Sequence, residues 1–135
     1  MSTEYGIHTR VEGSFDDVAE ATIAALKEEG FGVLTDIDVK ATMKNRLDVD
    51  VEPYRILGAC NPALAHEALV QEPNLGLLLP CNVVVRVDGD EVVVSAVDPA
   101  LMMGVTGNSE LEGVAAEAKS RLIRVIDSLK TSKIA

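Results

Sequence analysis

Aromatic residues are scarce in this chain. Trp is absent, and Tyr5, Phe15, Phe31 and Tyr54 are its whole aromatic content. Proteins that bind single-stranded nucleic acids stack the bases on aromatic side chains, so the sequence offers no stacking surface of that kind. The same scarcity means that the hydrophobic core must be built from Val, Leu, Ile and Ala.

Positive charge is also in short supply. The chain has 12 Lys and Arg against 22 Asp and Glu, which gives a formal net charge of −10, and the basic residues are scattered without a run. Phosphate backbones bind to basic surfaces, so we expect no nucleic-acid partner. An acidic surface of this kind is typical of a highly soluble protein or of one adapted to a salty cytoplasm.

Long apolar runs and cysteines are few. No segment approaches the roughly 18 apolar residues of a membrane span, and the first residues lack the basic and apolar segments of a secretory signal. Two cysteines are too few for a disulfide framework. We therefore expect a cytoplasmic protein with no membrane partner.

A length of 135 residues without a linker or repeat predicts one domain over residues 1–135, with its core at about 4–130.

Apolar residues recur with a period of two in some segments and with helical spacing in others, which predicts an α+β fold. We expect strands at residues 4–12, 31–35, 54–59, 75–79, 82–87 and 91–97, and helices at 15–29, 39–47, 62–72, 100–105 and 109–129. The Leu75–Leu79 run is interpreted as a strand or extended segment covered on both sides. Asp88-Gly89 predicts a hairpin turn, and Ser109 with Glu112 has the spacing of a capping box at the start of the last helix.

The segment from residue 54 to residue 87 contains the only candidate functional cluster. Cys60 directly precedes Asn61, the expected N-cap of a helix, where backbone N–H groups and the helix dipole stabilise a thiolate. Cys81 follows Pro80 at the start of a strand. If the two strands are neighbours, the sulfur atoms approach each other. That arrangement would permit a redox disulfide, a thiol nucleophile or part of a metal site.

Other observations favour a structural role for the cysteines. The spacings of Cys60 to His66 and to Cys81 match no metal-binding signature. His66 is expected about 140° round its helix from the apolar stripe, so it would point away from the core. Free cysteine is often a small buried hydrophobe. For the two cysteines, a structural role, a thiol role and a metal-binding role all stay open. The sequence contains no phosphate-binding loop and no GxSxG or HExxH motif. The sequence therefore assigns no catalytic residue, no metal ligand and no cofactor.

Several segments together resemble a known family. They are Gly30-Phe31-Gly32-Val33-Leu34, Asp38-Val39-Lys40, Gly58-Ala59-Cys60-Asn61-Pro62, Ala65-His66, Leu78-Leu79-Pro80-Cys81-Asn82-Val83 and Ala96-Val97-Asp98-Pro99. In this order and spacing the chain is similar, from Tyr5 to about Leu129, to the bacterial and archaeal family called domain of unknown function 302. The resemblance implies a small α+β domain with helices packed on a largely antiparallel sheet, in a TATA-binding-protein-like arrangement. It implies no role in DNA binding and no catalytic assignment.

We hypothesise a non-catalytic module that binds a small molecule or a protein near the Cys60 and Pro80-Cys81 junctions. The candidate residues are Cys60, Asn61, His66, Cys81 and Asn82. The alternative is a thiol-redox or metal-binding protein that uses Cys60 and Cys81. Whether the chain is an enzyme stays undecided. We also expect a homodimer, because domains of this size often bury apolar surface against a second copy.

Overall fold

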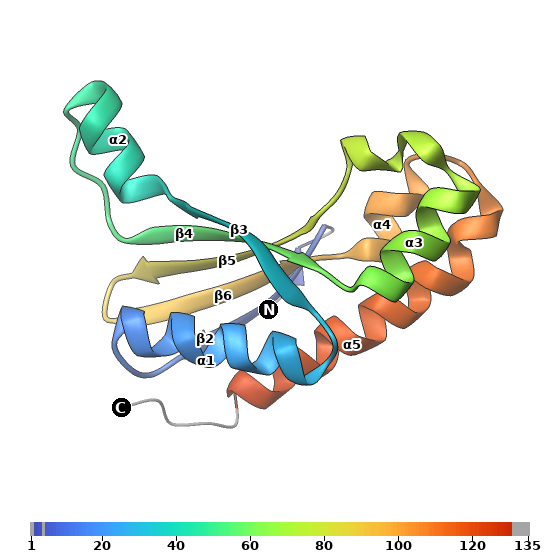
Figure 1. Cartoon of the computed structure of the whole chain (residues 1–135). Helices are drawn as coiled ribbons and strands as arrows, with labels where there is room; N and C mark the ends of the chain where they lie inside the picture. The colour runs from blue at the N-terminus through green and yellow to red at the C-terminus, as the bar shows by residue number, and fades with distance from the viewer. Residues whose placement is uncertain (1, 4, 131–135) are drawn as a thin grey trace.

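The protein is built around one antiparallel sheet. The structure, a computed structural model, describes residues 2–3 and 5–130. Its strands lie in the order β1-β2-β6-β5-β4-β3 (Figure 1). Their bounds are β1 (Ser2–Thr3), β2 (Gly6–Val11), β3 (Gly32–Asp38), β4 (Tyr54–Cys60), β5 (Cys81–Asp88) and β6 (Glu91–Val97). The α+β class and the antiparallel sheet are confirmed, while position 4 of the first expected strand lies outside the described residues.

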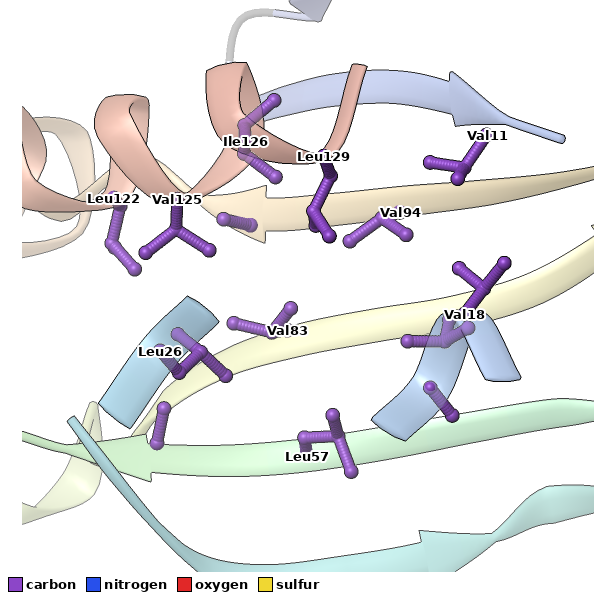
Figure 2. Packing of buried hydrophobic residues seen from close by; sticks show 14 of the residues in the cluster. Val11, Val18, Leu26, Leu57, Val83, Val94, Leu122, Val125, Ile126 and Leu129 are labelled. Carbon is purple, nitrogen blue, oxygen red and sulfur yellow. The ribbon is translucent and has the colours of Figure 1, made fainter. Parts of the chain in front are cut away.

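Two helices cover one face of this sheet. Helix α1 (Phe15–Glu28) begins at Ser14, whose Oγ accepts a hydrogen bond from the backbone N–H of Asp17 at 3.2 Å, and helix α5 (Glu112–Lys130) closes the chain. Both helices place their apolar stripes on the strands and form the main core (Figure 2). Its buried side chains include Val18, Leu26, Leu57, Val83, Val94, Leu122, Val125 and Leu129.

A second, smaller core lies at one end of the sheet. Helices α3 (Pro62–Gln71) and α4 (Pro99–Gly104) gather there against the first half of α5, together with the 3-10 turns η1 (Pro73–Leu77) and η2 (Ser109–Leu111) (Figure 1). Its buried members are Ala68, Leu75, Met103, Leu111, Val114 and Ala115. The ammonium of Lys119 lies 3.0 Å from a carboxylate oxygen of Asp98, which ties the start of α4 to α5.

Helix α2 (Val39–Leu47) is the outlier of the fold. It begins at Asp38, whose Oδ1 accepts a hydrogen bond from the N–H of Ala41 at 2.9 Å. All its residues are described, and none of them is buried. It projects from the end of the sheet opposite to α3 and α4 (Figure 1). The helix expected at residues 39–47 is therefore confirmed, and none of its residues belongs to either core.

The strand expected over Leu75–Leu79 is wrong. Residues 73–77 form η1, in which the N–H of Leu75 bonds to the carbonyl of Glu72 at 3.0 Å, and the N–H of Leu78 follows with the carbonyl of Leu75 at 2.8 Å. Leu75 is fully buried, whereas Leu77 is 88% exposed, so the run is not covered on both sides. A short apolar run does not by itself distinguish a strand from a helical turn. The sheet resumes only at Cys81, after a cis Leu79–Pro80 bond.

The capping box expected at Ser109 and Glu112 is also wrong. Asn108 is the capping residue, since its Oδ1 accepts a hydrogen bond from the N–H of Glu110 at 3.0 Å. Its amide also donates to the carbonyl of Gln71 at 3.1 Å, which links this turn to the end of α3. Ser109 is the first residue of η2, and Glu112 is the first residue of α5. The inward face expected for α5 is confirmed.

Candidate functional site

A cavity of about 300 Å³ lies where the two cores meet. Phe31 and Ala59 belong to the main core, Met103 belongs to the smaller one, and all three line this space. Its opening is beside Leu34, which is 69% exposed. The complete lining is Phe31, Leu34, Ala59, Cys60, Asn61, Leu64, Ala65, Leu69, Gly76, Leu79, Pro80, Cys81, Met103 and Ala118. Asn61 and the two thiols are the only lining residues whose side chains carry a polar or sulfhydryl group.

Gly58 shapes the wall of this cavity. A Cβ on Gly58 would lie 2.1 Å from Oγ1 of Thr35 and 2.8 Å from Cγ of Pro80, so β4 accepts only glycine there without a shift of its neighbours. On the adjacent strand β3, the register shifts between Val33 and Thr35. Such a bulge leaves one extra residue and redirects its side chain. Here the extra residue is Leu34, which lines the mouth of the cavity.

The two cysteines lie on neighbouring strands. Cys81 is the register partner of Ala59 in the β4–β5 pair, and Cys60 is the next residue of β4. Both are free thiols, Cys60 partly exposed and Cys81 only 5% exposed. Burial, and after it the neighbouring Cys60, raises the pKa of Cys81 to about 11. Cys81 is therefore a protonated thiol at neutral pH, and Cys60 is the thiol that solvent reaches.

Asn61 is the polar side chain of the cavity wall. It caps α3 as expected, because its Oδ1 accepts a hydrogen bond from the N–H of Leu64 at 3.2 Å. Only 8% of the residue is exposed. Its Nδ2 lies 2.9 Å from the position of a Cβ on Gly30, and Nη1 of Arg121 lies 3.1 Å from the same point. Arg121 Nη1 donates a hydrogen bond to the carbonyl of Glu29 at 3.1 Å and so joins α5 to this junction.

The structure places the other two candidates away from the cavity. His66 is exposed on α3, as its position on the helix predicts, and Asn82 is exposed on β5. Neither lines the cavity. Within residues 2–3 and 5–130, no three His, Cys, Asp or Glu side chains gather closely enough to hold a metal ion. The structure thus brings together Cys60, Asn61 and Cys81.

Much of the cavity wall escaped the sequence analysis. Phe31, Leu34, Met103 and Ala118 come from segments far from the cysteines in the chain. Met103 is only 4% exposed and also lines the cavity. Apolar residues of this kind carry no local signal, because they line a cavity only through the tertiary arrangement of β3, α4 and α5.

The fold and the cavity define a single α+β domain with an apolar, water-accessible recess between helices and a sheet. The chain belongs to the family described as Domain of unknown function DUF302, whose model matches residues 7–129. It is similar to an uncharacterized conserved DUF302 protein from Bacillus stearothermophilus, whose crystal structure aligns with a TM-score of 0.87 at 26% sequence identity. The alignment covers 94% of this chain and 99% of that one.

No curated protein matches the chain. None of the helices in the described part of the chain has the length and apolar character that a membrane crossing requires.

Proposed function

We propose that the protein binds a small, largely apolar molecule in the cavity between its two cores. The observation that carries this proposal is the lining itself, which is open to solvent beside Leu34 and yet almost entirely apolar. Ligand sites in proteins are typically apolar recesses with a few placed polar groups, at volumes from about 300 Å³ upwards. At roughly 30 Å³ for each water-sized group, the space suits a molecule of about ten non-hydrogen atoms.

The walls of the cavity favour binding with little rearrangement. They are held by β3, β4, α3, α4 and α5, so most lining side chains sit on regular elements rather than on a long loop. A preformed site loses little conformational freedom on binding, and the smaller entropic cost gives a higher affinity. The position of Pro80, fixed against Gly58, keeps one wall in place.

Calorimetric titration with naphthalene tests this proposal, with one variant that fills the cavity and one that does not. Ala65 and Ala63 both lie on α3, but only Ala65 lines the cavity, while Ala63 is exposed. Ala65→Phe places a ring in the space, so we expect its affinity for naphthalene to fall at least about tenfold. Ala63→Phe should bind like the wild type. The absence of wild-type binding, or equal losses in the two variants, would overturn the proposal.

Thiol chemistry at Cys60 is a second candidate, supported by the partly exposed thiol on the cavity wall beside a buried one. With an added peroxide as oxidant, Cys60 and Cys81 would each lose one hydrogen, a disulfide would form, and the peroxide would be reduced to water. Intact mass spectrometry reads the loss of two hydrogens. The product should be absent in Cys60→Ser and in Cys81→Ser. A wild-type mass that gains oxygen without losing hydrogen would argue against the pair.

Self-association is proposed for the free edge of the sheet. Among the strands in residues 2–3 and 5–130, β4 is the one neighbour of β3, and Leu34 and Ile37 on β3 are 69% and 48% exposed. An unpaired edge strand with exposed apolar side chains is a template for pairing with another strand. Because Leu34 also lines the mouth of the cavity, a second copy at this edge would cover the opening.

We also propose a cytoplasmic location, in keeping with the net charge of −10.

A further inference from the structure

The amide nitrogen of Asn61 makes no hydrogen bond to the part of the chain that the structure describes. Oδ1 must be the atom that faces the N–H of Leu64, since that bond needs an acceptor, and this fixes Nδ2 as the other end of the amide. Within the described residues, Nδ2 donates no hydrogen bond. The same part of the chain has no fully buried side-chain nitrogen or oxygen without a partner. Nδ2 therefore keeps contact with open space, and Asn61 is one of the residues that line the cavity.

We infer that the ligand of this cavity carries a carbonyl-type oxygen that accepts a hydrogen bond from Nδ2 of Asn61. This inference rests on the proposed function and names the chemical class of the molecule: an apolar body with a ketone, ester or carboxylate oxygen at one end. Only 8% of the Asn61 residue is exposed, and its side-chain oxygen accepts the capping hydrogen bond of α3, which restricts the direction of the amide. A positioned donor of this kind is what selects one polar group in an otherwise apolar site.

The surroundings of this donor favour an oxygen over a second apolar group. Asn61 stands at the N-terminus of α3, a helix of ten residues whose aligned peptide dipoles make that end partly positive. An apolar group against Nδ2 would leave the donor without water or acceptor, and a buried donor in that state is costly. The nearest charged group recorded there is the guanidinium of Arg121, also positive. A neutral carbonyl and a carboxylate both satisfy these conditions.

The test compares probes of similar size that differ in the oxygen. Naphthalene has no acceptor, 1-indanone has one neutral carbonyl, and octanoate has a carboxylate. The variant is Asn61→Asp, which keeps an oxygen for the N–H of Leu64 and so keeps the cap, but removes the N–H donor and adds a negative charge. Asn82→Asp is the matched control, because Asn82 is exposed, lies outside the cavity and receives the same change in charge.

We expect Asn61→Asp to lower the affinity for 1-indanone about tenfold or more, because the hydrogen bond to the carbonyl is lost. The affinity for octanoate should fall further, because its carboxylate is also repelled by the new negative charge. The affinity of Asn61→Asp for naphthalene should stay within about twofold of the wild-type value. Asn82→Asp should bind all three probes with wild-type affinity. Equal effects of Asn61→Asp on naphthalene and on 1-indanone would overturn this inference and leave the apolar site standing. Failure of the wild type to bind any probe would overturn the proposed function itself. Binding of 1-indanone without octanoate, or the reverse, identifies which kind of oxygen the site takes.

Discussion

Cys81 lies directly opposite Ala59 across the β4–β5 pair. Cys60, the next residue after Ala59 and the last of β4, therefore neighbours the buried thiol of Cys81. The two cysteines therefore share one cavity but differ in their surroundings. Cys81 is 5% exposed with its pKa raised to about 11, first by burial and then by Cys60, while Cys60 is partly exposed. This difference makes the accessible thiol the one at the end of the strand.

Alkylation should distinguish the two thiols. The thiolate is the reactive form and it must be reached by the reagent, so we expect iodoacetamide at neutral pH to modify Cys60 at least about tenfold faster than Cys81 in the folded protein. Peptide mass spectrometry of samples quenched over time measures both rates. Cys60→Ser should remove the fast phase, and Cys81→Ser should retain it. Equal rates in the folded protein would contradict the burial of Cys81.

The pKa of Cys81 should make stability fall in alkaline solution. Below its ordinary value of 9.0 the thiol is protonated in both states and adds no pH dependence. Between that value and about 11 the unfolded chain ionises while the folded chain keeps its proton, so rising pH favours unfolding. At about 1.4 kcal/mol for each pKa unit, the loss is of the order of 2–3 kcal/mol.

Urea unfolding at several pH values measures this loss against Cys81→Ala. Other groups titrate in both proteins and cancel in the comparison, so the stability advantage of the wild type over Cys81→Ala should shrink as the pH rises from about 8.5 to about 10.5. Cys60→Ala should retain the alkaline loss. An advantage that stays constant over this range would contradict the raised pKa.

Gly58 should tolerate no side chain. Gly58→Ala brings a methyl group to 2.1 Å from Oγ1 of Thr35 and 2.8 Å from Cγ of Pro80, and we expect a destabilisation of about 3 kcal/mol, because overpacked sites force their neighbours to move. Gly32→Ala is the control on the adjacent strand, since nothing lies within 4 Å of its added Cβ.

Thermal unfolding of both glycine variants reads the difference, and Thr35→Ala in the Gly58→Ala background should recover part of the loss. Equal melting temperatures for Gly58→Ala and Gly32→Ala would show that the wall at Pro80 is not tightly packed.

The free edge of β3 gives a prediction about assembly. Sedimentation velocity at micromolar concentration should show a dimer if this edge pairs with a second copy. Ile37→Lys places a charge on the edge and should shift the protein to monomer. Leu77→Lys, at a position 88% exposed on η1 at the far end of the sheet, is the control and should remain dimeric. A monomeric wild type at this concentration would remove the edge as an interface.

The local parts of the fold could be predicted from the sequence because their signals are local. Ser14, Asn61 and Asp98 accept hydrogen bonds from backbone N–H groups two or three residues further along the chain. Asp88-Gly89 lies at the hairpin turn between β5 and β6. Such signals depend on side chains within a few residues of one another. The errors arose where contacts between distant segments decide the structure: η1 formed in place of a strand, with Leu75 buried in the smaller core and Leu78 and Leu79 packed against it.

The candidate site could be predicted only in part, for the same reason. Cys60, Asn61 and Cys81 stood out because their residue types are rare or typical of caps. Their meeting, however, depends on the β4–β5 pairing, which no local pattern fixes. Leu34 and Met103 reach the cavity from β3 and α4, and as ordinary apolar residues they could not be told from core residues by sequence.

Nuclear Overhauser contacts between naphthalene and the methyl groups of the protein test the central claim most directly. They report where the molecule lies and not only that it binds. The account predicts contacts with the methyl groups of Leu64, Leu79 and Met103, which line the cavity. It also predicts none with Leu77 or Val105, which are exposed elsewhere at 88% and 76%. Contacts to those exposed residues alone, or the absence of contacts at saturating naphthalene, would contradict the account.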